Sequence, residues 1–148
     1  FSNDSYQFSG GLHGVGISVV NALSTLLEVK IWRDGEVKRI GFQSGDKALE
    51  LETVDTCGKK RTGTSVRFKP DPKYFDSPKF SIPRLKHNLR AKAVLCPGLK
   101  IIFKAPNAED NAEWYYEDGL TDYLKIHGAG LEVLPKEPFT GSMQGKTE

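Results

Sequence analysis

Long hydrophobic runs are missing from this sequence, in which no stretch approaches the roughly 18 consecutive apolar residues that a membrane-spanning helix requires. We therefore expect no membrane partner. Cysteine is also scarce, since Cys57 and Cys96 are the two thiols among 148 residues. Neither belongs to a C-x-x-C pair, and no His lies at zinc-ligand spacing, so the sequence predicts no zinc site. Reduced thiols and a cytoplasmic location are expected, with a Cys57–Cys96 disulfide as the alternative.

A large excess of one charge is missing as well. The sequence has 21 basic and 19 acidic residues, which leaves a net charge of +2. This balance is not typical of a strong nucleic-acid-binding surface, and the short basic clusters at 59–61 and 86–92 are interpreted as solvated faces. The composition, with 38% hydrophobic residues, fits one globular domain or part of one. Because the chain begins with Phe, we expect a fragment of a longer protein.

Alternating apolar and polar residues predict several strands in the first half of the chain. Residues 26–43 predict a β-hairpin, because the Asp-Gly pair at 34–35 tolerates the positive φ angles of a type I′ turn. Residues 48–54 predict another strand. A glycine-marked loop at 57–64 leads to a strand at 64–70, which a proline ends.

The second half begins with a predicted helix from about residue 81 to residue 93 or beyond. Ser81 can cap this helix, and apolar residues recur every three to four positions along it. Further along, the sequence predicts a strand at 99–105, a polar loop at 107–113, and a strand that runs into a short helix at 114–127. The mixture of strands and helices predicts an α/β or α+β class.

Glycine is concentrated in one short stretch, where four glycines fall between residues 10 and 16. Glycines let backbone N–H groups approach an anion without interference from a Cβ atom. If a helix begins near Val15, its first amides are unpaired and point outward, and Ile17, Val20 and Leu23 share one face. The stretch therefore indicates an anion-binding loop that leads into a helix. A strand or an ordinary turn remains the alternative, because the β-branched residues here favour strands.

Two known phosphate-binding motifs do not fit this stretch. The Walker A motif needs a Lys after its last glycine, and no Lys follows these glycines. The dinucleotide-binding pattern G-x-G-x-x-G would begin at Gly14, but Val19 stands where the third glycine allows close helix–strand packing. Binding of an anion here would require a different arrangement.

Three segments stand in a fixed order along the chain: YQFSGGLHGVGISVVNALS at 6–24, RTGTSVRF at 61–68, and DSPKFSIPRLKHNLRAKAVLCPGLKIIF at 76–103. The first resembles the ATP lid and glycine box of the B subunits of type IIA DNA topoisomerases, and the second resembles their T-G-T box. The third follows the same family in sequence. Within these segments, RAKAVLCPG and CGKKRTGTSV look more like topoisomerase IV than gyrase. The resemblance covers nearly the whole chain.

This resemblance implies a fold class and a domain organisation. The family has the split ATPase fold shared with heat-shock protein 90, MutL and histidine kinases. It is an α+β, two-layer fold with a mixed, mostly antiparallel sheet on helices, and this chain would form its C-terminal part. Residues 1–120 would belong to the ATPase domain, and residues 121–148 would lead toward a transducer domain outside the chain.

The resemblance also implies site residues. Those that would wrap the triphosphate, mainly through backbone amides, are Gly11, Leu12, His13, Gly14, Val15, Gly16 and Ile17. Tyr6 and Thr64 would lie at the adenine, and Arg33 at the rim of the pocket, where coumarin inhibitors extend. No catalytic or metal-binding residue is expected in the chain itself. The family's water-activating glutamate, Mg²⁺-binding asparagine and adenine-reading aspartate lie upstream, and its γ-phosphate lysine lies in the transducer domain.

The implied function is that of an ATP-binding segment of a bacterial type II DNA topoisomerase, which uses ATP and Mg²⁺ for strand passage, decatenation and relaxation of DNA. Its partners would be ATP, a second B subunit in an ATP-driven dimer, the topoisomerase A subunit and DNA, at the nucleoid in the cytoplasm. The isolated chain is expected to be inactive as an ATPase. A non-enzymatic domain that binds an anion in a glycine-rich nest remains the alternative.

Overall fold

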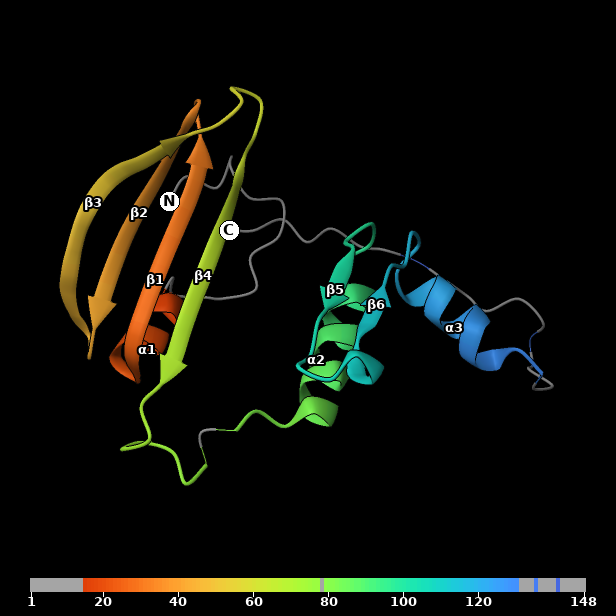
Figure 1. Cartoon of the computed structure of the whole chain (residues 1–148). Coiled ribbons are helices and arrows are strands. Elements are labelled where there is room, and N and C mark those ends of the chain that lie inside the picture. The colour runs from red at the N-terminus through yellow and green to blue at the C-terminus, as the bar shows by residue number, and fades with distance from the viewer. Residues whose placement is uncertain (1–14, 78, 131–134, 136–140, 142–148) are drawn as a thin grey trace, which may run out of the picture. The chain divides into compact units, whose positions relative to one another are not determined.

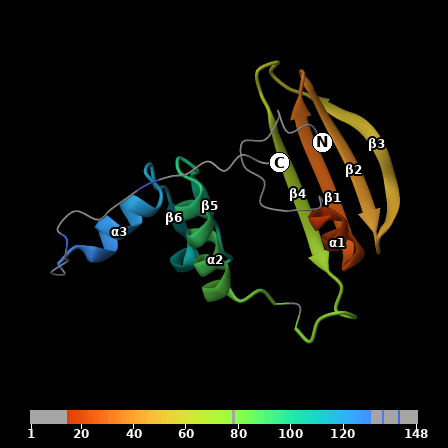
Figure 2. The same ribbon diagram turned by 180° about the vertical axis from the view of Figure 1, so that it is seen from behind.

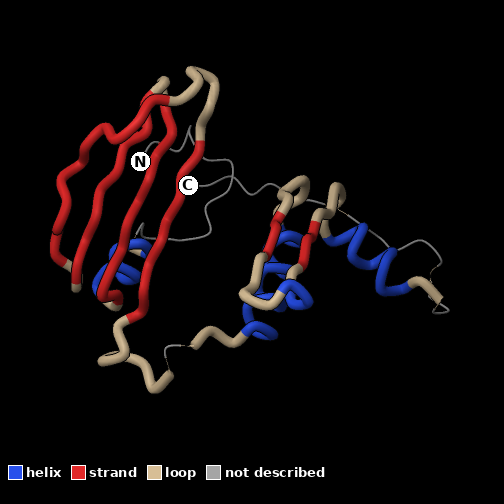
Figure 3. Tube along the Cα trace, in the orientation of Figure 1, coloured by secondary structure: helices blue, strands red, loops and turns tan. Residues whose placement is uncertain are grey.

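The computed structural model describes residues 15–77, 79–130, 135 and 141. The chain separates into two compact units, Phe1–Lys79 and Phe80–Glu148. The described part of the first unit combines one short helix with a four-stranded sheet, and that of the second combines two α-helices with a two-stranded sheet (Figures 1 and 3). A further boundary after residue 120 stays a prediction.

The sheet of the first unit is antiparallel throughout, with the order β3-β2-β1-β4 (Figure 1). Its strands are β1 (Ser24–Arg33), β2 (Glu36–Gln43), β3 (Asp46–Thr56) and β4 (Gly63–Pro70). All of them were predicted, although β3 is longer at both ends than its alternating pattern suggested. The loop predicted before β4 is also observed, and the chain turns at Lys59 and Lys60.

Two tight turns connect the first three strands. Asp34 and Gly35 both have positive φ angles, 54° and 84°, as the predicted type I′ hairpin requires. Ser44 and Gly45 repeat this conformation with φ angles of 50° and 91° between β2 and β3. This second turn was not predicted, because Ser is a weaker signal than Asp or Asn for a left-handed position.

The two faces of the sheet differ in chemistry. On β1, Leu27 and Val29 alternate with Glu28 and Lys30, and successive side chains point to opposite faces. The apolar face comprises Leu27, Val29 and Ile31 of β1 with their cross-strand partners Ile40 and Phe42 of β2 and Thr64, Val66 and Phe68 of β4. The polar face comprises Glu28, Lys30, Arg39, Glu52 and Arg67.

The helix α1 (Gly16–Ala22) lies against β1 and β4 near one end of the sheet (Figures 1 and 2). Leu27 is only 1% exposed, whereas Leu26 before it is exposed. The apolar face is therefore the one that α1 covers at this end. The helix forms in spite of three β-branched residues, and it confirms the helix predicted to begin near Val15 over the strand alternative. Of the predicted helix face, Val20 and Leu23 are half-buried, while Ile17 is 48% exposed.

In the second unit, α2 (Ile82–Leu95) packs against a two-stranded sheet of β5 (Ile101–Phe103) and β6 (Ala112–Trp114) (Figure 1). A short 3₁₀ helix, η2 (Ala108–Asp110), precedes β6, and α3 (Leu120–Gly128) follows it. Ala93, Val94 and Tyr116 form the buried cluster of this unit, against which Trp114 and Tyr123 pack. The helix predicted from about residue 81 to residue 93 or beyond is thereby confirmed, and it is buried near its C-terminal end.

Several local expectations for the second unit were wrong in detail. Ser81 stands at the start of α2, but its side chain makes no capping hydrogen bond. The strand predicted at 99–105 is shorter, because only 101–103 pair with β6. The polar segment 107–113 is not a plain loop, since Asn107 accepts a hydrogen bond from the Glu109 N–H and starts η2.

Neither cysteine is disulfide-bonded. The Cys57 Sγ lies 3.5 Å from the carbonyl oxygen of Glu36, where it can donate a weak hydrogen bond. None of the helices in the described ranges is long and apolar enough to cross a bilayer.

Candidate functional site

The predicted phosphate-binding segment is described from Val15 onward. Tyr6, Gly11, Leu12, His13 and Gly14 lie outside the described residues, and their roles stay predictions. Val15 takes the N-cap position of α1 in a helical conformation, with no side-chain cap. The Val19 N–H donates the first intrahelical hydrogen bond, to the Val15 carbonyl at 3.0 Å. The amides of the three residues before Val19 precede the hydrogen-bonding frame of the helix, as helix geometry requires.

The first residue of α1 is not crowded by the described residues. A Cβ atom built on Gly16 would meet no described atom within 4 Å, and its φ is not positive. Packing among the described residues therefore does not require glycine at this position, nor does backbone conformation. Close approach of a ligand to the backbone would require it. Val15 and Ile17 on either side are 54% and 48% exposed.

The other end of α1 is tied to the sheet. The Asn21 Nδ2 donates to the carbonyl oxygen of Gly45 at 2.9 Å, in the turn between β2 and β3. The Ser24 hydroxyl donates to the carbonyl oxygen of Val20 at 2.6 Å, and Ser24 is buried. The direction of α1 relative to the sheet is thus set by polar contacts as well as by burial of Leu27.

Thr64 is the second residue of β4, which begins one residue before its predicted start at 64. Its cross-strand partner is Ile31, which places Thr64 on the apolar face that α1 covers further along. Thr64 is exposed, so its hydroxyl is accessible. The loop before it is held to the sheet by Arg61, whose guanidinium carbon lies 5.1 Å from the ring centroid of Trp32.

Arg33 is the last residue of β1 and alternates onto the same face as Ile31. Its side chain is 79% exposed, and its Nε lies 3.4 Å from an Asp34 carboxylate oxygen. Both side chains are exposed, so this pair contributes little to stability. The position of Arg33 at the rim of the pocket stays a prediction.

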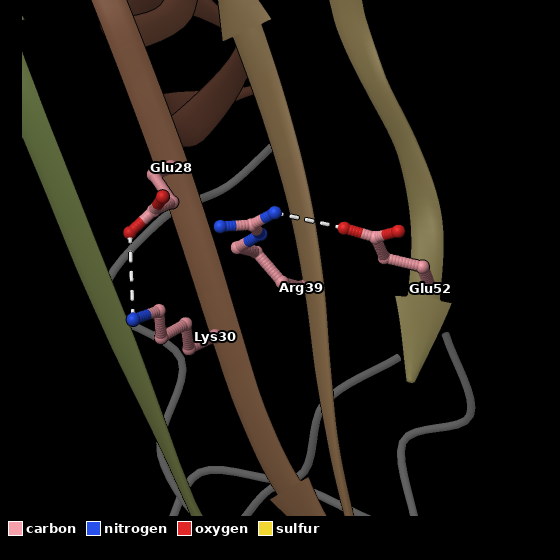
Figure 4. A network of polar contacts seen from close by, with 4 residues as sticks. All are labelled: Glu28, Lys30, Arg39 and Glu52. Carbon is pink, nitrogen blue, oxygen red and sulfur yellow. Dashed lines mark hydrogen bonds and ion pairs between the residues drawn. The ribbon is translucent and has the colours of Figure 1, made fainter. Parts of the chain in front are cut away.

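The polar face of the sheet presents paired charges (Figure 4). Arg39 of β2 forms an ion pair with Glu52 of β3 at 2.8 Å, and Lys30 lies 3.9 Å from Glu28 on β1. Because these carboxylates lie on the face opposite Thr64, they are not placed to act on a ligand beside Thr64. The described residues contain no cluster of three His, Cys, Asp or Glu side chains that could hold a metal ion.

No family model matches the chain. The B subunit of DNA topoisomerase 4 from Pseudomonas aeruginosa is 59% identical over 148 residues, which cover all of this chain and 24% of that protein. This chain belongs to the family of type IIA topoisomerase B subunits. It spans about a quarter of the length of the curated relatives that it matches.

Solved structures of topoisomerase B subunits agree with this assignment. The ATP-binding domain of topoisomerase IV from Francisella tularensis, in complex with a small-molecule inhibitor, superposes with a TM-score of 0.76 at 44% identity; the match covers 93% of this chain and 38% of that one. The ATPase domain of Thermus thermophilus gyrase B, in complex with an aminocoumarin, superposes with a TM-score of 0.73 at 35% identity. This match covers 86% of this chain and 35% of that one. The predicted fold class is confirmed. The topoisomerase IV relative named above is more identical to this chain than this gyrase is. This agrees with the two sequence segments that look more like topoisomerase IV than gyrase.

Two contacts that order this part of the topoisomerase fold were not predicted from the sequence. Arg61 in the loop before β4 contacts Trp32 in β1, which lies 29 positions earlier in the chain, and no local sequence pattern predicts this contact. The Asn21–Gly45 hydrogen bond likewise depends on the Ser44-Gly45 turn. A polar residue near the end of an apolar helix, such as Asn21, is a weak signal for such a contact. Its partner Gly45 could not be identified because the turn at Ser44-Gly45 was not predicted.

Proposed function

We propose that this chain forms the phosphate-binding and adenine-bordering part of an ATP site in a type II topoisomerase B subunit. The observation that carries the proposal is that α1 and Thr64 belong to one face of one sheet. Backbone amides from Gly11 to Ile17 would bind the triphosphate, with Tyr6 and Thr64 at the adenine and Arg33 at the rim. Solved relatives that carry an ATP-binding or ATPase domain support this placement.

The chain supplies binding groups and not the reacting groups. Mg²⁺ bound with ATP would neutralise charge on the transferred phosphoryl group. The described residues offer no cluster for this ion. From the family resemblance, we propose that its ligand lies upstream of the chain. The first turn of α1 likewise contains no acidic residue that could activate water. Hydrolysis would therefore need groups that other parts of the subunit contribute.

For the longer protein, we propose ATP-dependent passage of DNA strands, with relaxation and decatenation of DNA. A second B subunit, the topoisomerase A subunit and DNA would be its partners, in the bacterial cytoplasm at the nucleoid. The names of the relatives support this assignment. The alternative from a different class is a domain that binds anions in a glycine-rich nest without catalysis.

Loss of the Thr64 hydroxyl tests the adenine border. Thr64→Ala in the full-length subunit should weaken binding of a non-hydrolysable ATP analogue several-fold, because a single hydrogen bond contributes about 0.5–1.5 kcal/mol. Titration calorimetry measures the change. Thr53→Ala is a matched control, since Thr53 is an exposed threonine on edge strand β3. Equal affinity of the Thr64→Ala variant and the unaltered subunit would remove Thr64 from the site.

Phosphate release separates the binding and catalytic contributions. The 148-residue chain alone should release no phosphate from ATP above background, because a positioned general base typically contributes about 10²–10⁴-fold and the first turn of α1 contains no acidic residue. A coupled phosphate assay measures the rate, with a full-length topoisomerase IV B subunit as the positive control. Turnover by the chain close to that of the control would show that a base lies within this sequence.

A further inference from the structure

The second unit contains a surface hollow between α2 and β6. Its volume is about 330 Å³, and it is lined by Pro83, Lys86, His87, Arg90, Ala112 and Trp114. The α2 residues at its wall recur at intervals of three and four, so they occupy one face of the helix. Lys86 and Arg90 stand one turn apart on that face, about 6 Å along the helix axis. We call this feature the basic hollow.

The cations of the basic hollow have no carboxylate within ion-pair distance among the described residues. α2 carries four Lys or Arg residues and no Asp or Glu. Neither Lys86 nor His87 forms an ion pair within the described ranges. The Arg90 guanidinium carbon lies 5.9 Å from the ring centroid of Tyr123, an aromatic contact that leaves its charge unpaired. Nearby, in contrast, Lys100 of this unit is paired with Glu113 at 2.7 Å.

The cluster at 86–92 was interpreted from the sequence as a solvated face; from its place at the basic hollow, we propose instead that it binds the phosphate backbone of duplex DNA. The choice of DNA as the polyanion rests on the proposed function, whereas the affinity for phosphate rests on these unpaired cations. Long cationic side chains in a row along one helix face suit successive phosphates of a strand. Trp114 packs against the buried cluster of Ala93, Val94 and Tyr116, so its ring is engaged in the core. The hollow therefore contacts the DNA backbone and does not stack on bases, and binding should be independent of DNA sequence.

The test is the salt dependence of DNA binding by the full-length subunit. The double variant Lys86→Ala/Arg90→Ala should bind a short labelled duplex roughly tenfold to a hundredfold more weakly at about 0.1 M salt. The slope of log K against log salt should fall by about 1.8, since each phosphate contact contributes about 0.9. Fluorescence anisotropy measures both quantities. Arg90→Lys keeps the charge but alters the contact with Tyr123, and it should retain the DNA affinity.

A matched control removes two charges elsewhere. Lys59 and Lys60 are exposed in the loop before β4, and Lys59→Ala/Lys60→Ala should leave the DNA affinity within about twofold. An equal loss in this control, or an unchanged slope in the Lys86/Arg90 variant, would overturn the proposal. So would tighter binding of a single strand than of the duplex. Affinity for an ATP analogue, measured on the same variants, should stay unchanged. Absence of ATP binding in the unaltered subunit would count against the proposed function and leave the DNA result standing.

Discussion

Replacing Gly16 with Val in the full-length subunit should lower the affinity for a non-hydrolysable ATP analogue by at least about a hundredfold. The branched side chain would fill the open space beside the first amides of α1 and displace the phosphates. Loss of two hydrogen bonds to a charged group, at about 1.5–3 kcal/mol each, accounts for an effect of this size. The same result is expected for Gly14→Val, at a position outside the described residues.

Stability should not change with Gly16→Val. A Cβ atom at Gly16 meets no described atom within 4 Å, and valine is no worse than glycine in a helix, so the free energy of unfolding should stay within about 1 kcal/mol. Gly128→Val is the matched control, because Gly128 also has open space and ends α3 in the other unit. Calorimetric affinity of the Gly16→Val variant equal to that of the Gly128→Val control would refute the phosphate-binding role of α1.

Replacing Gly119 with Ala should destabilise the second unit by roughly 2–5 kcal/mol. Gly119 has a φ angle of 57° and a ψ angle of −116°, a conformation that L residues rarely adopt. A Cβ atom there would lie 2.8 Å from the Pro97 Cγ and 2.8 Å from the backbone oxygen of Val94. Strain and overpacking each cost about 1–3 kcal/mol, and the Val94 backbone cannot move without disturbing α2.

Gly98→Ala separates these two causes. Gly98 also has a positive φ angle, 77°, but a Cβ atom there would meet nothing within 4 Å, so only the strain of about 1–2 kcal/mol should appear. Denaturant unfolding followed by tryptophan fluorescence measures both variants. A Trp32→Phe background leaves Trp114 as the one tryptophan, located in the affected unit. Equal destabilisation by the two substitutions would show that the contacts of Gly119 with Pro97 and Val94 carry no cost.

Strong local signals account for the parts of the fold that the sequence predicted. The Asp34-Gly35 turn lies between two alternating runs, and this pattern has few alternatives to a hairpin. The α2 helix combines apolar spacing with a Pro-Gly pair beyond its end. Short elements were harder to predict, because β5 and β6 have only three residues each and form by pairing with each other. Such pairing is a long-range effect that a local window does not contain.

The candidate site was predictable to a smaller extent from physical patterns alone. Glycine spacing indicated an anion-binding loop. The β-branched residues that follow favour a strand by their intrinsic propensity, but they form the helix α1 because it packs against β1 and β4. Thr64 looked like an ordinary strand residue. Its relation to α1 arises from the β1–β4 pairing, which connects residues more than 30 positions apart. The family resemblance supplied the link that the local patterns could not.

Hydrogen–deuterium exchange of the full-length subunit, with and without a non-hydrolysable ATP analogue, tests the central claim most directly. The claim is that the amides at the start of α1 bind the phosphates of a nucleotide whose base lies at Thr64. Peptides that cover residues 11–17 should exchange more slowly when the analogue is bound, and peptides that cover the start of β4 should also gain protection. The exposed edge strand β3 should show no change. Bound analogue with unchanged exchange at residues 11–17 would contradict the account.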